Sequence, residues 1–359
     1  MNNIIMKTGG SSADVIVEKR NRSAEIIIVL FEYCNLSCSF CPQNHNSTIG
    51  LSYKEIVSKA DKVIEFIDNN TFATEFVVRI MGGELFTDEV ITPEILLAYK
   101  ELLHRIRSKS KLNDRELEFV FVTNLTMKDC RKPVLEFIHS QEDASLVPSY
   151  DIKGRFNPSQ RETFKENIEI FRNYIRNINT VMTRSNIEAV LEGDELHDYL
   201  YDNFDYSWDM YVKTTTSMHE APKESTVLEF YKLLADKYPN VEYIRPFLRP
   251  IGEGSFNHTI CSRGNNLSLN EYGEAVADGC AGTHYLRRQD IPVATDTTRD
   301  FIYSSVDDFI EKYNCFACPY FQRCPMACFS GIKSGNMIND MDTCINKLLF
   351  EYVDSKKKK

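Results

Sequence analysis

Apolar residues recur along the first two thirds of the chain in two alternating patterns. Continuous runs rich in β-branched and aromatic residues predict strands at 25–31, 75–81, 117–122, 144–147, 179–183 and 208–212. Between these runs, apolar residues recur every three or four positions and predict helices over 52–68, 96–106, 161–176 and 222–237. Strands and helices that alternate in this way are typical of βα units around a parallel sheet. We therefore expect an α/β fold, a partial (βα)6 barrel similar to a TIM barrel.

The pattern changes near residue 249. Glycines, cysteines and short segments replace the long helices, and the one regular element that we expect there is a closing helix near 342–353. This change places a domain boundary near 245–255. The chain then divides into an N-terminal segment (1–21), a core domain (22–248), a small cysteine-rich α+β domain (249–354) and a lysine-rich tail (355–359).

Composition and charge narrow the possible partners. The chain has 359 residues, of which 43% are hydrophobic and 26% charged, as in ordinary soluble globular proteins. Its net charge of -10 argues against nucleic acid as the main partner, because binding to phosphates needs a basic face. No apolar run approaches a membrane span, and the polar first ten residues lack the apolar part of a signal peptide. We expect a cytoplasmic protein that binds neither nucleic acid nor a membrane.

The distribution of the eleven cysteines indicates metal binding. Three lie between Cys34 and Cys41, seven lie between Cys261 and Cys344, and Cys130 stands alone on a polar loop. A secreted disulfide scaffold would be short and preceded by a signal peptide, and this chain has neither feature. Clustered thiols in a reducing compartment favour a metal site, whereas Cys130 is predicted to be a free thiol.

The first cysteine group follows the first predicted strand directly. Cys34, Cys38 and Cys41 have the spacing C-x3-C-x2-C, so three thiolates can converge on one face of a loop. A 4Fe-4S cluster normally takes four thiolates, and three would leave one iron open for a substrate or cofactor. A zinc knuckle or a buried cysteine cluster is the alternative interpretation of these three residues.

With Phe40 directly before the third cysteine, this stretch resembles the signature of the radical S-adenosylmethionine (SAM) superfamily. The resemblance implies that SAM chelates the open iron through its amino and carboxylate groups. It also implies that an electron from the cluster cleaves SAM to a 5′-deoxyadenosyl radical, which abstracts a hydrogen atom from the substrate. A flavodoxin-type or ferredoxin-type protein would supply the electron.

Other short motifs at predicted strand ends resemble the SAM-contacting residues of that superfamily. Gly82-Gly83-Glu84 closes the second strand, Asn124 begins a turn in which Leu125 replaces the usual glycine, and Ser149 and Asp151 follow the fourth strand. Each motif taken alone also fits an ordinary turn or helix cap. In βα barrels, functional groups gather on the loops after the strands, where these residues lie. The SAM-binding residues that the resemblance implies are Phe40, Gly82, Gly83, Glu84, Asn124, Ser149 and Asp151.

The second cysteine group lies in the C-terminal region. Its central part, Cys315 to Cys328, has the spacing C-x2-C-x5-C-x3-C, and Cys261, Cys280 and Cys344 flank it. Seven cysteines exceed the needs of one tetrahedral metal ion and are one short of two fully ligated 4Fe-4S clusters. A double zinc ribbon would accept the same ligands. The group resembles the SPASM extension of radical SAM enzymes, although Ala275 stands where that family usually has a glycine and Gly273 is displaced.

By this resemblance, the extension would hold two auxiliary 4Fe-4S clusters, which makes three clusters in all. The first would be held by Cys261, Cys280 and Cys328, and its fourth iron would be open or bound by His258. The second auxiliary cluster would be held by four ligands, Cys315, Cys318, Cys324 and Cys344.

The sequence as a whole therefore predicts a radical SAM oxidoreductase. The resemblance favours a maturase that oxidises or crosslinks a side chain of a peptide or protein, with a small-molecule substrate as the alternative. A non-catalytic iron–sulfur electron carrier and a zinc-stabilised binding protein are alternatives of another class. Tyr206, Trp208, Tyr211 and Arg245 lie near late strand ends and either line the substrate cavity or belong to the core or rim.

Overall fold

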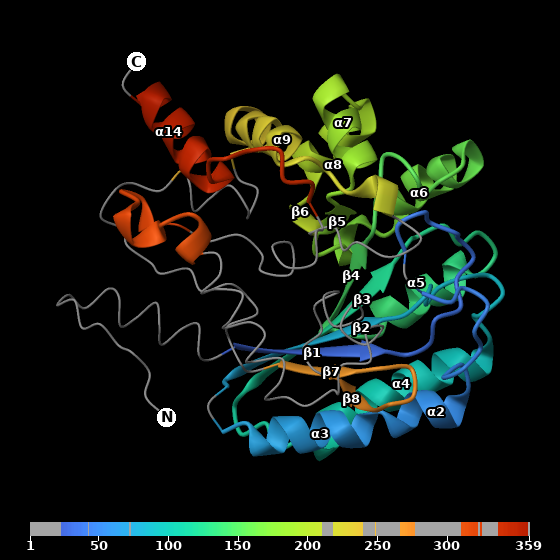
Figure 1. Cartoon of the computed structure of the whole chain (residues 1–359). Helices are drawn as coiled ribbons and strands as arrows, with labels where there is room; N and C mark the ends of the chain where they lie inside the picture. Colours follow the sequence, from blue (N-terminus) through green and yellow to red (C-terminus); the bar gives the residue numbers. More distant parts are fainter. Residues whose placement is uncertain are drawn as a thin grey trace.

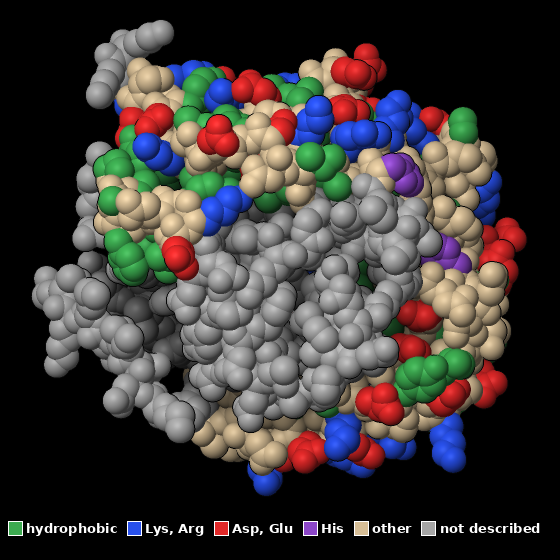
Figure 2. All heavy atoms as spheres, viewed as in Figure 1, with side chains coloured by type: hydrophobic (Ala, Val, Ile, Leu, Met, Phe, Trp, Pro, Cys, Tyr) green, Lys and Arg blue, Asp and Glu red, His purple; other side chains and the backbone are tan. Residues whose placement is uncertain are grey.

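The computed structural model describes residues 23–41, 43–71, 73–209, 218–239, 248, 266–276, 310–321, 324 and 337–357. Within these residues, a parallel sheet lies at the centre and helices cover its outer face (Figure 1). Charged side chains of both signs are interspersed over the described part of the surface seen in Figure 2. No helix of the described residues is long and apolar enough to cross a membrane.

The main sheet has the strand order β4-β3-β2-β1-β7-β8, and all its pairs are parallel except β7 with β8. Two further parallel strands, β5 and β6, form a second sheet. Isolated bridges from Leu146 to Ile175 and from Ser149 to Asn179 connect β4 with β5. The strands are β1 (Ser23–Val29), β2 (Glu75–Met81), β3 (Glu116–Thr123), β4 (Ala144–Pro148), β5 (Ile178–Val181), β6 (Tyr206–Asp209), β7 (Asn266–Leu269) and β8 (Ala275–Val276).

This arrangement confirms the predicted α/β fold, an open partial barrel, and no closed barrel is found among the described residues. Since β1 to β6 run in parallel through neighbouring positions, their carboxyl ends lie at one edge. Side chains along β1 alternate between two faces that differ in burial: Ile26 and Ile28 are fully buried in the core, whereas Glu25 on the other face is half-buried. β2 repeats the pattern, with Ile80 buried and Arg79 half-buried. The half-buried face is the concave inner face of the strands, the lumen.

Helices pack against the outer face and begin at well-formed caps. The side chains of Ser52, Thr92, Asn157, Thr183 and Asp194 each accept a hydrogen bond from a first-turn backbone N–H. Such a cap contributes about 1 kcal/mol. The helices are α2 (Tyr53–Ser58), α3 (Ala60–Asn69), α4 (Pro93–Lys109), α5 (Arg131–His139), α6 (Pro158–Ile170), α7 (Arg184–Glu192), α8 (Glu195–Asn203), α9 (Glu224–Lys237) and α14 (Ile345–Lys357), with short 3-10 turns η1 (Arg172–Tyr174), η2 (Met218–Glu220) and η4 (Cys315–Ala317).

Some elements differ from the sequence-based expectation. The helix expected over 52–68 is found as α2 and α3, which meet at Lys59 in near-helical backbone. The helix expected over 161–176 ends at Ile170 and begins earlier, because Asn157 and Gln160 form a capping box and Pro158 occupies the first turn. β5 begins and ends one or two residues earlier than expected, and β6 begins at Tyr206, two residues early, while the rest of its expected range, 210–212, lies outside the described residues. α5, α7 and α8 were not predicted, and the apolar segment at 241–244 lies outside the described residues.

Parts of the range 249–354 contact the core directly. β7 pairs with β1, and the Lys59 ammonium donates a 3.0 Å hydrogen bond to the Glu271 carbonyl oxygen beside β7. α14 packs on α9, where the Tyr352 hydroxyl donates a 2.6 Å hydrogen bond to the Asp236 carboxylate. The division into two domains stays a prediction, whereas these contacts attach both the hairpin and the last helix to the core.

Candidate active site

The cysteine loop begins where β1 ends. Leu36, Cys38 and Phe40 are buried in one small apolar cluster, and Cys34 and Cys41 pack against it. A 3.1 Å hydrogen bond from the Cys41 N–H to the Cys38 carbonyl oxygen closes the turn between the last two cysteines. The loop therefore brings its three thiols to one site at the carboxyl edge of the sheet.

Burial sets the acidity of these thiols. It raises the pKa of Cys34 to about 12 and that of Cys41 to about 11, and it also raises the pKa of Cys38. Charge on Cys38 raises the pKa of Cys34 and of Cys41 further, as expected for neighbouring thiols. Free thiols in this loop would be protonated at neutral pH, so metal binding would release protons.

Arg155 supplies a cation beside the cysteine loop, and it belongs to none of the motifs found in the sequence. Its guanidinium carbon lies 5.5 Å from the centre of the Phe40 ring, and its charge lowers the pKa of Cys38 and of Cys41. The turn before it approaches closely: at Gly154, with φ of +79°, an added Cβ would lie 3.1 Å from the Ser39 hydroxyl. A positive charge here would stabilise thiolates and an anionic cluster.

The donor set fits an iron–sulfur cluster. Among the residues that the structure describes, no three Cys, His, Asp or Glu side chains converge as a ready site for a single metal ion. A 4Fe-4S cluster distributes its thiolates over separate irons, so it does not need three sulfur atoms around one point. Three thiols on one buried loop beside a guanidinium are suitable ligands for it.

Gly82 and Gly83 bring the end of β2 against the start of this loop. The Gly83 N–H donates a 2.8 Å hydrogen bond to the Phe31 carbonyl oxygen, and the Glu84 N–H does the same to Tyr33. A Cβ at Gly83 would lie only 2.0 Å from the Tyr33 carbonyl oxygen, and one at Gly82 would lie 2.6 Å from that of Phe31. Glycine is therefore required for this backbone packing.

The Glu84 carboxylate lies inside the fold. It is 1% exposed and accepts hydrogen bonds from the Phe86 N–H at 2.9 Å, the Thr123 hydroxyl at 2.6 Å and the Asn124 N–H. Burial raises its pKa, and these hydrogen bonds oppose that change. A carboxylate offers about four acceptor positions, so these three hydrogen bonds leave about one of them unused.

Asn124 connects the end of β3 to the cysteine loop. Its side-chain amide donates a 2.8 Å hydrogen bond to the Asn35 side chain, and its oxygen accepts from the Thr126 hydroxyl at 2.6 Å. The next residue, Leu125, is fully buried and has a φ of +55°, in the left-handed region that favours glycine. The turn thus has a backbone that favours glycine, although the residue is leucine.

Ser149 and Asp151 lie where β4 ends. The Ser149 N–H donates a 2.7 Å hydrogen bond to the Thr123 carbonyl oxygen. The Asp151 carboxylate, 1% exposed, forms an ion pair with Arg155 and accepts a 2.6 Å hydrogen bond from the Asn186 side chain and a 3.0 Å bond from the Val181 N–H. Asp151 therefore connects the ends of β4 and β5, the start of α7 and the arginine beside the cysteines.

Tyr206 and Trp208 do not line the lumen. Both are buried on the outer face of β6, where the Trp208 ring lies 4.7 Å from Phe230 and 5.6 Å from His197. They belong to the core, because β-strand side chains alternate between faces. Tyr211 and Arg245 lie outside the described residues.

Four C-terminal cysteines lie near one another. Charge on Cys344 and Cys318 adds to burial in raising the pKa of Cys315 to about 11. The Cys324 sulfur accepts a 3.6 Å hydrogen bond from Asn346, two residues after Cys344. Gly273 has a φ of +76° in the β7–β8 turn, and Ala275 begins β8. The remaining predicted ligands, Cys261, Cys280, Cys328 and His258, lie outside the described residues.

Cys130 is buried, in contrast to the polar loop expected from its neighbours. Cys130 lies at the start of α5 and is only 6% exposed. Its backbone N–H donates a 2.8 Å hydrogen bond to the Asp88 carboxylate. Burial raises the pKa of its thiol, and the charge of Asp88 raises it further. A thiol with a raised pKa is of low reactivity, and the expectation that Cys130 binds no metal stays a prediction.

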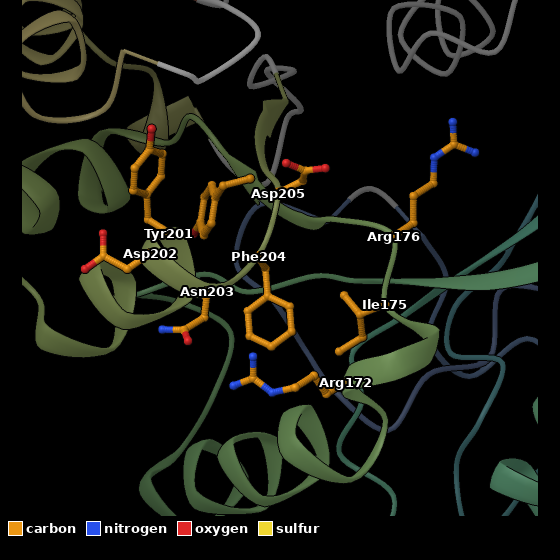
Figure 3. A pocket seen from close by; sticks show the side chains of 9 residues that line it. Arg172, Ile175, Arg176, Tyr201, Asp202, Asn203, Phe204 and Asp205 are labelled. Carbon is orange, nitrogen blue, oxygen red and sulfur yellow. The ribbon is translucent and has the colours of Figure 1, made fainter.

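A cleft of about 590 Å³ lies at the opposite edge of the strands, before β5 and β6 (Figure 3). Asp205 and Phe204 line it together with Arg172 and Arg176. Arg172 forms an ion pair with Glu169, and Arg176 with Glu118. The cleft is therefore separate from the cysteine loop, and its arginines are already neutralised.

Comparison with known proteins gives matches among solved structures. The chain resembles native anSMEcpe, an anaerobic sulfatase-maturating enzyme, with bound AdoMet (TM-score 0.62, 16% identity, 93% of this chain and 98% of that one). It also resembles anSMEcpe with bound AdoMet and Cp18Cys peptide (TM-score 0.61, 17% identity, 93% and 97%). This chain has their fold. The resemblance to radical SAM enzymes is thus confirmed for the fold, whereas no protein-family model and no curated protein sequence matches.

Proposed function

We propose that this chain is a radical SAM enzyme that modifies a peptide or protein side chain by oxidation or crosslinking. The observation that carries the proposal is the cysteine loop itself. Its three thiols lie beside Gly82-Gly83-Glu84 at the carboxyl edge of the sheet. The fold is that of an enzyme whose structures contain AdoMet and a peptide.

In this function, Cys34, Cys38 and Cys41 would hold a 4Fe-4S cluster. When bound, such a cluster supplies one electron at low potential. The loop's burial keeps water from the thiolates, and Arg155 offsets their charge. Reduced burial or loss of that cation would shift the cluster potential, since solvent exposure and charge both affect it.

The groups around the loop would bind SAM. Glu84 has an acceptor position left for a donor such as the SAM ammonium. Asn124 and Ser149 lie on the neighbouring strand ends, and Phe40 and Arg155 flank the cysteines. Asp151 would support SAM binding indirectly, because its carboxylate orients Arg155 and the end of β5.

The C-terminal cysteines would hold auxiliary clusters. Cys315, Cys318, Cys324 and Cys344 provide four thiolates for one 4Fe-4S cluster, and their proximity supports this set. We assign Cys261, Cys280 and Cys328 to a further cluster by the family resemblance, with His258 or an open iron at its fourth position. These clusters would accept an electron from the substrate radical, and a flavodoxin-type or ferredoxin-type protein would reduce the first cluster.

Iron content and SAM cleavage test the proposal. On anaerobically reconstituted protein we expect about twelve irons per chain and 5′-deoxyadenosine after reduction with SAM. The triple variant Cys34→Ala/Cys38→Ala/Cys41→Ala should lose about four irons and all SAM cleavage. Cys130→Ala is the matched control and should keep both. Zinc in place of iron, or SAM cleavage that survives the triple substitution, would contradict the radical SAM function.

A further inference from the structure

Asp209 faces the lumen at the carboxyl end of β6. Alternation along the strand sends Tyr206 and Trp208 to the buried outer face, so Ser207 and Asp209 lie on the inner face. The Asn179 side-chain amide, on the inner face of β5, donates a hydrogen bond to the Asp209 carboxylate. Despite its place among other strands, Asp209 is exposed.

Two other carboxylates near this lumen, Glu25 and Asp151, contact cations. Glu25 accepts a 2.9 Å hydrogen bond from Arg79, and Asp151 forms an ion pair with Arg155. Within the described part of the chain, the hydrogen-bond partner of the Asp209 side chain is the neutral Asn179, and the nearest favourable charge is on Arg79, which Glu25 already neutralises. Of Glu25, Asp151 and Asp209, only Asp209 lacks a contacting cation among the described residues.

Asp209 also lies close to the proposed radical chemistry. It is the register partner of Val181 on β5. Val181 packs against the apolar cluster of the cysteine loop, and its N–H donates to Asp151. One strand thus separates Asp209 from the residues around Cys38, on the edge where parallel barrels place their substrates.

The electrostatics of the site favour an incoming cation. Although the Asp209 side chain keeps an exposed surface, the protein atoms around it displace water and raise its pKa to about 6. The negative charges of Asp151 and Glu25 also raise this pKa, and Arg79 lowers it. The charged form is thus destabilised in the absence of a partner. A cation brought next to the carboxylate would remove this cost and add a charge-assisted hydrogen bond.

We propose that Asp209 binds a cationic group of the peptide substrate, an ammonium or guanidinium, and so helps select which side chain is presented to the cysteine loop. This inference rests on the proposed function and specifies its substrate class. Asp209 would contact the substrate directly, whereas Asn179 would orient its carboxylate.

Binding of matched peptides tests the inference. The probes are acetyl-Gly-Gly-Lys-Gly-Gly-amide and its norleucine and glutamate counterparts, titrated calorimetrically at pH 7.5 into reconstituted protein with SAM. We expect the lysine peptide to bind about tenfold more tightly than the norleucine peptide, and Asp209→Asn to remove this preference. Asp205→Asn, at the other end of β6, should keep it.

A second measurement needs no variant: the wild-type preference should fall as the pH decreases from 7.5 to 5, because protonation removes the Asp209 charge. Equal binding of the lysine and norleucine peptides, or a preference that Asp209→Asn retains, would overturn the inference. 5′-Deoxyadenosine measured on the same wild-type samples tests the proposed function separately. SAM cleavage without a lysine preference would reject only the role of Asp209.

Discussion

His197 should make the protein lose stability in acid. This side chain lies in α8, fully buried, with its ring 5.0 Å from Tyr206, 5.6 Å from Trp208 and 5.4 Å from Tyr238. Neither ring nitrogen has a hydrogen bond within the described residues, although Nδ1 lies 3.6 Å from the Asp198 carboxylate. Burial lowers the pKa of His197 to about 4, and Asp198 only partly opposes this.

The sign and size of the stability change follow from the different pKa values of His197 in the unfolded and folded chain. The unfolded chain takes up the proton near pH 6.5, whereas the folded chain resists it until about pH 4. The free energy of unfolding therefore decreases as the pH falls below 6.5, and the loss is complete below about 4. Between pH 7.5 and 4.5 this one group should remove about 2.5 kcal/mol.

Denaturant unfolding of the wild type and of His197→Phe, compared at each pH, isolates this effect. Phenylalanine has a similar size and cannot take up a proton, and carboxylates that titrate in both proteins cancel in the difference. The free energy of unfolding of the wild type minus that of the variant should be about 2.5 kcal/mol smaller at pH 4.5 than at pH 7.5. A difference that stays constant within about 0.5 kcal/mol across this range would refute the reasoning.

Two further substitutions test how the site is built. Gly83→Ala should cost more than about 3 kcal/mol in denaturant unfolding, because its Cβ would lie 2.0 Å from the Tyr33 carbonyl oxygen. Gly193→Ala, which has a φ of +99° but open space, should cost about 1 kcal/mol, and equal costs would contradict the packing argument. Arg155→Met should cost about 3 to 5 kcal/mol because it leaves the buried Asp151 charge unpaired. Arg155→Lys keeps the charge and should cost less, so an equal loss would contradict the ion-pair explanation.

The elements that could be predicted from the sequence are those whose pattern is local and long. β2 was predicted at its observed bounds because its run of apolar residues ends at a glycine pair. α5, α7 and α8 have nine residues each, too few for the apolar repeat to separate them from a loop. They form because packing against the sheet stabilises short helices that would be marginal alone.

The site was only partly predictable for a different reason. The motifs marked the strand ends, because glycines and cysteines at fixed spacing depend on local backbone geometry. Arg155 and Asp209 could not be found in this way, since their importance comes from residues more than 25 positions away in the sequence, such as Cys38, Arg79 and Asn179. Their charged groups meet their interaction partners only when the chain has folded.

The motif residues also build the site that they are expected to serve. Glu84 accepts two hydrogen bonds that join the end of β2 to the end of β3, and a third from the nearby Phe86 N–H. Asp151 accepts hydrogen bonds from Val181 and Asn186 and pairs with Arg155, which joins β4 to β5 and α7. A glutamine at position 84 would turn an N–H toward at least one of those donors, and an asparagine at 151 would do likewise. Loss of SAM cleavage in such variants would therefore combine a lost ligand contact with a displaced strand end. Asp209 is less affected by this ambiguity, because among the described residues its carboxylate accepts one side-chain hydrogen bond, from the Asn179 amide, and the backbone pairing of β5 with β6 does not depend on it.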